Sequence, residues 1–458
     1  MKHSFDAIVV GAGQAGPFLA VRLAESGRKV AMVERKLFGG TCVNTGCTPT
    51  KAMVASAHAA HLARRGGDFG VRIESLRVDL RKVRERTDKI VLQSRNGQEK
   101  WVRGTTNCTV FTGTASFASP HVVHVGDEAL EAAQIFLNVG ARPAIPRLRG
   151  TDSVPFLTSS TILHLEDLPS HLVVVGGGYV GLEFAQMFRR FGSEVTVVDR
   201  NPRLAAHEDA DASKVIGEVF GPEGIGIRTS ANCIHLEKGG SGILVGLECD
   251  EGAPHVAGSH VLLAVGRIPN TGDLNLAAAG VTVDDQGYIT VDDQLRTSAE
   301  GIFALGDCNG RGAFTHTSYN DYEIVADNLL LGSSRRISDR IQAHALYIDP
   351  PLAQVGMTED EVRRSGRAAL IGKRPMTRVS RAIEKGETFG FMKILVDAES
   401  RQILGATFFG TGADEAIHCV LTAMYARLTA DRLAHSMHIH PTVAELIPTV
   451  LGELKPLV

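Results

Sequence analysis

The apolar positions of this chain fall in short runs with helix-forming stretches between them, which is the pattern of an α/β protein. Residues 5–10 form a short apolar run, interrupted by Asp6, of the kind that a buried parallel strand needs. A helical stretch over 18–26 and a second strand over 29–33 follow it. The same order of strand, helix and strand returns later, at 172–175, 182–191 and 194–198. The pattern therefore predicts two similar α/β units in one chain.

The other elements are predicted from further apolar runs and from composition. A helix with many exposed charges is expected over 74–100, and a small antiparallel unit over 110–117 and 122–125. Additional apolar strands are expected over 135–139, 261–265 and 301–307. From residue 343 onward the chain is expected to form an antiparallel sheet with helices, through strands 390–396 and 402–410 and helix 414–426.

Each of the two units carries the spacing Gly-x-Gly-x-x-Gly between its first strand and its helix. The glycines of this motif are Gly11, Gly13 and Gly16 in the first unit and Gly176, Gly178 and Gly181 in the second, where Gly177 is a further glycine. An acid ends the second strand of each unit, Glu34 and Asp199, eighteen residues after the last glycine in both cases. Glycines let the backbone approach a pyrophosphate at the helix N-terminus, and the acid accepts a ribose hydroxyl. The repeated spacing predicts two Rossmann-like dinucleotide sites, and a nucleotide-free glycine turn is the alternative at each.

Two cysteines stand five positions apart directly after the first unit, in the segment Gly-Gly-Thr-Cys42-Val-Asn-Thr-Gly-Cys47-Thr-Pro-Thr-Lys51. Thr48 is a good N-cap, Pro49 suits the first helical position, and an alanine-rich helix is expected over 52–63. A helix N-terminus and a nearby lysine both favour a thiolate. The segment therefore predicts a redox-active pair, and two buried structural thiols are the alternative.

Composition narrows the class of protein. A chain of 458 residues is long enough for two to four domains. A net charge of −3 and 5% aromatic residues disfavour a nucleic-acid partner. The seven cysteines are odd in number and contain one closely spaced pair, which fits a cytosolic redox site better than a secreted disulfide framework. No apolar run approaches the ~20 residues that cross a bilayer, so we expect a cytoplasmic protein without an anchor.

A histidine-rich segment near the C-terminus, Met-His438-Ile-His440-Pro-Thr, is followed by Glu445. An imidazole oriented by a carboxylate is well matched to proton transfer near neutral pH. The segment therefore predicts an imidazole positioned by a carboxylate. A metal site is not expected, because no third ligand lies at a useful spacing.

The cysteine segment resembles the active-site segment of the flavoprotein disulfide reductases, which include dihydrolipoyl dehydrogenase, glutathione reductase and mercuric reductase. The glycine motifs and the His-Pro-Thr segment extend this resemblance over nearly the whole chain, and the core looks most like mercuric reductase. It implies two Rossmann-like domains and a C-terminal α+β dimerisation domain. The implied division is an FAD domain over 1–150, an NAD(P) domain over 151–270, a return to the FAD domain over 271–340 and a dimerisation domain over 341–458.

The resemblance also implies roles for single residues. The catalytic set would be Cys42, Cys47, His440, Glu445, Lys51 and Glu183. Contacts with FAD and NADH or NADPH would come from Gly11, Gly13, Gly16, Glu34, Gly40, Thr41, Lys51, Ala115, Gly140, Asp307, Thr315, Gly176, Gly178, Tyr179, Gly181, Glu183, Asp199 and Gly266. His440 would be the base, Glu445 its orienting group and His438 a packed side chain. In this scheme Lys51 pairs with Glu183 beside the flavin, Asp307 binds the ribityl chain, and Tyr179 covers the flavin until nicotinamide displaces it.

The implied activity is an electron relay in a homodimer whose subunits share the active site. NADH or NADPH reduces FAD, FAD reduces the Cys42–Cys47 disulfide, and the dithiol reduces a small disulfide, a metal ion or another electrophile. Alternatives are dihydrolipoyl dehydrogenase, an NAD(P)H oxidase or transhydrogenase with idle cysteines, and a nucleotide-sensing module. Asp199 favours NADH, whereas Arg200 and Arg203 could accept the 2′-phosphate of NADPH.

Two features depart from the relatives. Mercuric reductases carry an extra cysteine pair at the C-terminus, and this sequence has no cysteine after Cys419. Delivery of Hg(II) to the active site by that route is therefore not expected. Thr45, Thr48 and Thr50 also differ from the usual choices of lipoamide-type enzymes.

Overall fold

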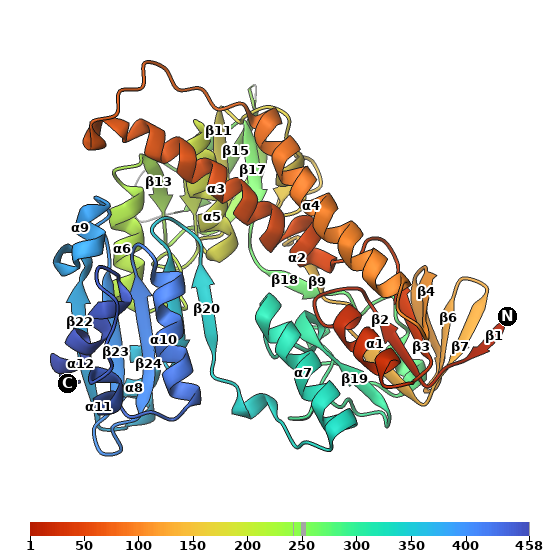
Figure 1. Cartoon of the computed structure of the whole chain (residues 1–458). Helices are drawn as coiled ribbons and strands as arrows, with labels where there is room; N and C mark the ends of the chain where they lie inside the picture. Colours follow the sequence, from red (N-terminus) through yellow and green to blue (C-terminus); the bar gives the residue numbers. More distant parts are fainter. Residues whose placement is uncertain (241, 249–252, 458) are drawn as a thin grey trace.

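The computed structural model describes residues 1–240, 242–248 and 253–457. Figure 1 shows the N-terminal elements and the C-terminal sheet at opposite sides, with the second α/β unit and the long helices α3 and α4 above and between them. Cys249, one of the seven cysteines, lies outside the described residues. No helix in the described part of the chain is both long and apolar enough to span a bilayer.

The first unit is built on a parallel sheet of five strands in the order β19-β8-β2-β3-β4. Its strands are β2 (Ala7–Val10), β3 (Val30–Glu34), β4 (Cys108–Thr112), β8 (Gln134–Leu137) and β19 (Ile302–Ala304). Helices α1 (Gly16–Glu25) and α7 (Thr315–Leu331) belong to this unit, and α4 (Leu80–Arg103) packs against α1 and β4. Strand β19 is brought in from far along the chain, because its apolar residues pair with β8.

A smaller sheet beside the first unit has the order β1-β7-β6-β5. Its strands are β1 (Lys2–Ser4), β5 (Ala115–Ser119), β6 (Val122–Val125) and β7 (Glu128–Glu131). The single strand expected over 110–117 is wrong. Gly113 has a positive φ of 155° and separates the run into β4, which joins the parallel sheet, and β5, which joins this one.

The second unit repeats the first, with a parallel sheet in the order β10-β17-β11-β12-β13. Its strands are β10 (Leu157–Thr158), β11 (His171–Val175), β12 (Glu194–Val198), β13 (Ile225–Arg228) and β17 (His260–Leu263), and its helices are α5 (Tyr179–Phe191) and α6 (Ala210–Phe220). An antiparallel sheet that the pattern did not predict follows, from β14 (Asn232–Gly239), β15 (Gly242–Glu248) and β16 (His255–Gly258). The antiparallel pair β9 (Ala141–Pro143) and β18 (Arg267–Pro269) links the two units.

The C-terminal part is an antiparallel sheet of six strands in the order β20-β21-β24-β23-β22-β25. The strands are β20 (Ala343–Leu346), β21 (Leu352–Gly356), β22 (Ala369–Pro375), β23 (Phe391–Asp397), β24 (Ile403–Phe409) and β25 (Lys455–Pro456). The helices are α8 (Glu359–Ser365), α9 (Ser380–Glu384), α10 (Ala413–Tyr425), α11 (Ala430–Ala434) and α12 (Ile447–Gly452). This agrees with the antiparallel sheet expected from residue 343 onward.

The cysteine segment forms two helices, α2 (Gly40–Thr45) and α3 (Cys47–Arg64). The predicted N-cap at Thr48 is wrong, because Gly46 holds that position and its carbonyl accepts the Thr50 N–H at 3.0 Å. Pro49 lies in the first turn, where an N–H has no partner within the helix, so its missing donor costs nothing there. The charged helix α4 likewise starts later than expected, at the Asp79 cap, whose carboxylate accepts the Lys82 N–H at 3.2 Å.

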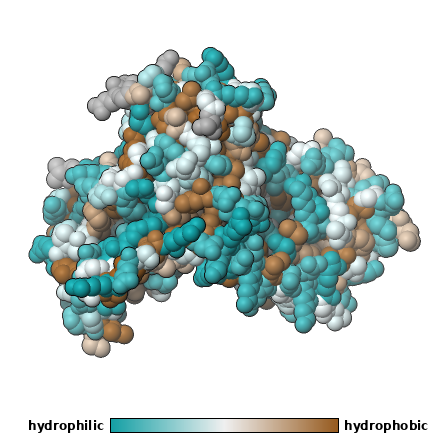
Figure 2. Space-filling model, turned by 90° about the horizontal axis from the view of Figure 1, so that it is seen from above, coloured by the Kyte–Doolittle hydropathy of each residue, from teal (hydrophilic) through white to brown (hydrophobic). Residues whose placement is uncertain are grey.

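The largest apolar core holds α3 against α5 and reaches the C-terminal sheet. Met53 from α3, Phe184 and Phe188 from α5, and Phe409 from β24 are members of one buried cluster. Full burial of each such side chain stabilises the fold by about 1.5–3 kcal/mol. Figure 2 shows that polar residues cover most of the face seen from above, with apolar residues in small groups between them. The core therefore fixes the helix that begins with Cys47 against the second unit.

Candidate active site

The first glycine loop is closed too tightly for any side chain. Gly11 has φ +102°, and a Cβ there would lie 2.3 Å from the Asn138 carbonyl oxygen. A Cβ on Gly16 would lie 2.0 Å from the Gly11 carbonyl oxygen. Glu34 accepts the Ala12 N–H at 2.7 Å, so the acid at the strand end also holds the loop. The loop thus presents backbone rather than side chains at the start of α1, as a bound pyrophosphate requires.

Asn138, which the sequence reasoning missed, completes this loop. Its side-chain oxygen accepts the N–H groups of Ala15 at 3.3 Å and Gly16 at 3.0 Å, and its amide donates to the Leu305 carbonyl at 2.9 Å. It is buried at the carboxyl end of β8. The available signal was a polar residue that directly follows an apolar strand, next in space to the glycine turn.

The second glycine loop has the same construction. Gly176 has φ +115°, and its Cβ would lie 2.3 Å from the Ala264 carbonyl oxygen. A Cβ on Gly181 would lie 1.9 Å from the Gly176 carbonyl oxygen, and one on Gly178 would meet nothing within 4 Å. Asp199 accepts the Gly177 N–H, in the role that Glu34 has in the first loop. The predicted internal repeat is therefore present in the geometry.

The cysteine segment lies directly on the first loop. Gly39 donates its N–H to the Ala12 carbonyl at 2.8 Å, and Gln14 donates to the Gly39 carbonyl at 3.0 Å. A Cβ on Gly40 would lie 2.9 Å from the Cα of Gly13, so the two backbones touch. Cys42 within α2 is half-buried, and Cys47 at the start of α3 is exposed. The fold therefore brings both thiols to the edge of the first dinucleotide loop.

The two thiols have opposite acidities. The pKa of Cys47 is lowered to about 6, first by the hydrogen bond from Cys42 and further by Thr315 and the charge of Lys51. The pKa of Cys42 is raised, because its S–H is held by Cys47 and because it is partly buried. The Thr315 hydroxyl lies 3.3 Å from the Cys47 sulfur. The pair is thus arranged so that Cys47 carries the thiolate and Cys42 the proton.

Lys51 lies one turn into α3 and pairs with Glu183, as the sequence predicted. Its Nζ is 2.6 Å from Glu183 Oε2 and 4.6 Å from the centroid of the Tyr347 ring. The other oxygen of Glu183 accepts the Tyr347 N–H at 2.9 Å. Glu183 is buried, and a buried carboxylate is tolerated when it is paired and hydrogen-bonded. The ion pair fixes a positive charge close to Cys47.

Asp307 and Arg267 form a second charged group beside the cysteine segment. Burial raises the pKa of Asp307, and the Arg267 guanidinium opposes that rise from 3.5 Å away. Arg267 also donates to the Ala141 carbonyl, as does the hydroxyl of Thr41 at 3.4 Å. The sequence reasoning gave Arg267 no role. Its position directly after an apolar strand was the signal.

Tyr179 begins α5, and its hydroxyl donates to the buried Glu208. Its ring lies 5.4 Å from the ring of His344 and 6.2 Å from that of Phe314, the residue before Thr315. Glu208, His344 and Phe314 were not predicted, because they come from three segments that no short motif connects. The predicted residues Ala115, Gly140 and Gly266 are placed by backbone: Ala115 is buried at the start of β5, and Gly140 and Gly266 border β9 and β18 at positive φ.

His440 and Glu445 form the predicted pair, with the Nδ1 of the imidazole 2.8 Å from Glu445 Oε2. The side chain of His440 is 75% exposed. The helices on either side of it, α11 and α12, lie at the outer edge of the C-terminal part, away from α2 at the centre (Figure 1). Within one subunit the histidine is therefore remote from the cysteines.

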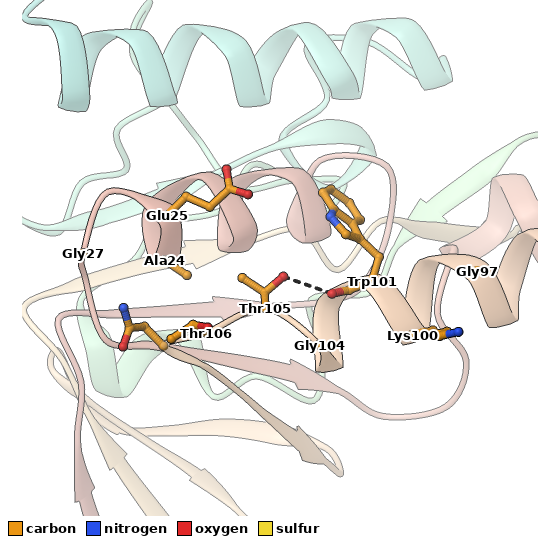
Figure 3. A pocket seen from close by; sticks show the side chains of 10 residues that line it. Ala24, Glu25, Gly27, Gly97, Lys100, Trp101, Gly104, Thr105 and Thr106 are labelled. Atoms are coloured by element: carbon orange, nitrogen blue, oxygen red, sulfur yellow. Dashed lines mark hydrogen bonds between the residues drawn. The ribbon is translucent and has the colours of Figure 1, made fainter.

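A cavity with a volume of about 720 Å³ lies elsewhere in the part of the chain that the structure describes. Figure 3 shows it between the end of α1, marked by Glu25 and Gly27, and the end of α4, marked by Trp101 and Gly104. Gly27 precedes β3 and Asn107 precedes β4, so the cavity is at the amino ends of the parallel strands. The glycine loop follows the carboxyl end of β2, where dinucleotides bind in such sheets. We therefore do not assign the cavity to a nucleotide.

The residues present fit an FAD at the first loop and a nicotinamide dinucleotide at the second. Both loops expose backbone where a Cβ would collide, both lead into a helix N-terminus, and both keep an acid at the strand end. In the described residues no group of three or more histidine, cysteine or acidic side chains could hold a metal ion. Fold and site together define a dinucleotide-dependent oxidoreductase with a pair of redox cysteines.

Comparison with known proteins identifies the family. The profile of the pyridine nucleotide-disulphide oxidoreductases matches residues 5–321, and that of the family's dimerisation domain matches 342–451. A mercuric reductase of Streptomyces lividans is 34% identical over 97% of this chain and 94% of its own length. A dihydrolipoyl dehydrogenase of Chlamydia muridarum is 31% identical over 97% of this chain and 96% of its own.

A solved structure, the Cu(II) complex of the HOCl-induced flavoprotein disulfide reductase RclA from Escherichia coli, is also similar. It superposes with a TM-score of 0.90 at 32% identity and covers 98% of this chain and 99% of that one. The chain therefore belongs to the flavin-dependent pyridine nucleotide-disulphide oxidoreductases, which are enzymes that use FAD and NAD(P)H. The resemblance inferred from the sequence is confirmed, and so are the expected fold class and cofactors.

Proposed function

We propose that this enzyme passes two electrons from NAD(P)H through FAD to the Cys42–Cys47 pair and on to a small disulfide, metal ion or other electrophile. The observation that carries the proposal is the unequal pair of thiols on the first dinucleotide loop, one with its pKa lowered to about 6 and one with its pKa raised. In balance, NAD(P)H gives a hydride and a disulfide acceptor takes two electrons and two protons. Bound FAD supplies the two-electron step between nicotinamide and cysteines.

In this proposal each residue of the site has a separate role. Cys47 stays a thiolate, held by Thr315 at 3.3 Å and by the positive charge of Lys51. Cys42 is the thiol that attacks the acceptor, and because its pKa is raised it needs a base. Glu183 keeps Lys51 charged and in place through the 2.6 Å ion pair. The glycine loops, with Glu34 and Asp199, hold the two dinucleotides by backbone contacts and ribose hydroxyls.

The base is His440 of a partner subunit in this proposal. An exposed imidazole that is already oriented by Glu445, and that is remote from the cysteines of its own chain, is available to a second copy. A two-fold symmetric dimer gives each site one histidine from the other subunit. The family's dimerisation domain over 342–451 supports an assembly of this kind.

The choice between the two nicotinamide cofactors is proposed to favour NADH. Asp199 accepts the Gly177 N–H and, at 2.6 Å, the Asn201 N–H, so its side chain is held in place at the second loop. A carboxylate accepts a ribose hydroxyl and repels a 2′-phosphate. The guanidinium of Arg203 is already engaged with the carbonyls of Ala206 and Glu208, which leaves Arg200 as the exposed cation.

The acceptor is proposed to be small, because it must reach two adjacent thiols on a helical segment. The relatives named mercuric reductase and the Cu(II) complex of RclA favour thiophilic metal ions as one class. Disulfides are the other class, and the dihydrolipoyl dehydrogenase relatives favour the reverse, lipoamide-linked reaction as the second candidate. A reducing cytoplasmic location is part of the proposal, since a working dithiol needs one.

Anaerobic titration of the FAD-loaded enzyme with NADH and NADPH tests the proposal, followed by a panel of disulfides, dihydrolipoamide with NAD⁺, Hg(II) and Cu(II). We expect reduction by the nucleotide, two thiols gained per subunit, and turnover with at least one acceptor. Cys42→Ser should remove that turnover, and Cys108→Ser is the matched control. Turnover that survives Cys42→Ser would instead identify an oxidase or transhydrogenase. Bound FAD without any reduction by NAD(P)H would leave only the nucleotide-sensing role.

A further inference from the structure

Glu208 is a buried carboxylate that none of the steps above uses. The residue is 2% exposed. Its Oε1 accepts the hydroxyl of Tyr179 and lies 2.8 Å from Nε2 of His344, on β20 of the C-terminal sheet. Its Oε2 is buried and has no hydrogen-bond partner among the described residues. An unpaired oxygen of a buried carboxylate costs free energy, so the fold keeps Glu208 here at the expense of stability.

Tyr179, which donates to this carboxylate, lies between the second glycine loop and the segment that contacts Cys47. Tyr179 follows Gly178, the second glycine of the second loop. Its ring packs towards Phe314, which precedes the Thr315 that touches Cys47. Burial and the charge of Glu208 raise the pKa of Tyr179, so its hydroxyl stays protonated and donates. The ring is therefore tied down at its outer end by a charged hydrogen bond.

The segment that carries Glu208 is held firmly. Arg203 donates to the Glu208 carbonyl at 2.9 Å. The next residue, Asp209, accepts from the fully buried Lys393 at 2.8 Å and from the Glu359 N–H at 3.0 Å. These contacts fix the backbone at Glu208 and the residue after it, so we expect the tyrosine ring to make the movement that separates the pair.

We propose that Glu208, with His344, is a positioning residue that latches the Tyr179 ring in the closed position and so weakens binding of the nicotinamide half of NAD(P)H. This inference rests on the proposed function and on the role that the family resemblance implies for Tyr179, whose ring covers the flavin until nicotinamide displaces it. Opening the ring breaks the hydrogen bond to Oε1 and leaves both carboxylate oxygens with one partner, His344. The latch adds that loss to the cost of binding nicotinamide and adds nothing to the cost of binding the adenosine half.

Calorimetric titration of the oxidised, FAD-loaded enzyme tests the latch with two probes. The first is 1,4,5,6-tetrahydro-NAD, a neutral analogue that carries a nicotinamide-like ring and is not oxidised. The second is ADP-ribose, which lacks that ring. We expect Tyr179→Phe, which removes the charged hydrogen bond, to tighten binding of the first probe by about tenfold. Glu208→Gln, which weakens it to a neutral hydrogen bond, should tighten binding of the first probe by less, and both changes should leave the second probe unchanged. The double variant should bind no tighter than Tyr179→Phe alone, because both changes act on the same contact.

His316→Gln is the matched control, because His316 stacks on Phe314 at 5.3 Å and donates from Nε2 to the Ala343 carbonyl without touching Glu208. Equal tightening of both probes by Glu208→Gln would overturn the latch and identify a general effect on the cleft. Unchanged binding of both probes in Glu208→Gln, with Tyr179→Ala still selective for the first, would also overturn it while leaving the covering ring intact. If Tyr179→Ala changes the affinity for both probes equally, the covering role of Tyr179 itself is wrong. Thermal unfolding of each variant checks that the fold is kept.

Discussion

Gln14 and Tyr179 occupy the same place in the two glycine loops, directly after the second glycine, yet they reach different parts of the chain. Gln14 donates to the Gly39 carbonyl and ties the cysteine segment to the first loop. Tyr179 donates to Glu208 and ties the second loop to the C-terminal sheet through His344. The backbones around them are closely alike, with Cβ positions at Gly11 and Gly176 each 2.3 Å from a carbonyl oxygen.

The loops also differ in the residue that supplies this carbonyl. Asn138 does so in the first unit and caps the loop with its side chain, whereas Ala264 does so in the second and has no side chain that could. A capped loop is rigid and suits a cofactor that stays bound. An uncapped loop keeps its N–H groups for a nucleotide that comes and goes. The two loops thus share one backbone geometry and differ in the side chains at two positions.

Substitution of the first glycine in each loop should have the largest effect, and the effect should differ between the two loops. Gly11→Ala should give protein without bound flavin and without activity, because its Cβ meets backbone that cannot move. Gly176→Ala should keep the flavin and lose about a hundredfold in the rate of NAD(P)H-driven reduction, for strain of up to ~3 kcal/mol. Flavin absorbance and stopped-flow reduction measure the two effects. Gly27→Ala, at φ +91° with nothing within 4 Å of its Cβ, controls for positive φ alone.

The thiols attached to the first loop should show a large difference in acidity. In the reduced enzyme Cys47 is a thiolate above about pH 6, whereas the raised pKa of Cys42 keeps it protonated well above neutrality. Alkylation of Cys47 by iodoacetamide should fall about tenfold for each pH unit below 6, since only the thiolate reacts. Cys42→Ala should move this midpoint upward, because the hydrogen bond from Cys42 is the largest cause of the low pKa. A midpoint that stays in place would show that Lys51 and Thr315 suffice. Peptide mass spectrometry assigns the modified residue.

The cap on the first loop should matter for flavin retention. Asn138→Ala removes the acceptor for Ala15 and Gly16 and the donor to Leu305, which leaves buried groups unpaired at a cost of about 1–3 kcal/mol. We expect a lower unfolding midpoint and faster loss of FAD on dilution. Asn138→Asp keeps the acceptor and should recover part of the loss. If Asn138→Ala releases FAD no faster than the unchanged enzyme, the Asn138 cap does not explain the difference between the loops.

Removal of the Asp199 charge in the second loop should have the smallest of these effects. Asp199→Asn keeps an oxygen for the Gly177 N–H but removes the charge that repels a 2′-phosphate. We expect the ratio of kcat/KM for NADH over NADPH to fall about fivefold, the equivalent of ~1 kcal/mol. Glu34→Gln in the first loop is the matched change and should leave this ratio alone. A ratio unaffected by Asp199→Asn would assign the choice to Arg200 and its neighbours.

The sequence determined the local features, because spacing along the chain encodes them directly. Three glycines and an acid at fixed intervals predicted both loops, the Cys42–Cys47 spacing with Lys51 predicted the thiol segment, and His-Pro-Thr predicted the pair of His440 and Glu445. The starts of helices were predicted less well. Gly46 and not Thr48 precedes the cysteine helix, because neighbouring backbone and not a capping side chain fixes that turn.

Only the tertiary structure decided which distant residues meet. Asn138, Arg267, Glu208 and His344 touch the predicted site from strands or loops that lie far from it in the sequence. Pairing of β8, β18 and β20 with their neighbours brings Asn138, Arg267 and His344 there. The two strands made from the run 110–117 show the same limit, because partners in two sheets divided an apolar stretch that looks continuous. The period and spacing of residues predict local structure over short segments, whereas contacts between distant elements depend on how whole sheets assemble.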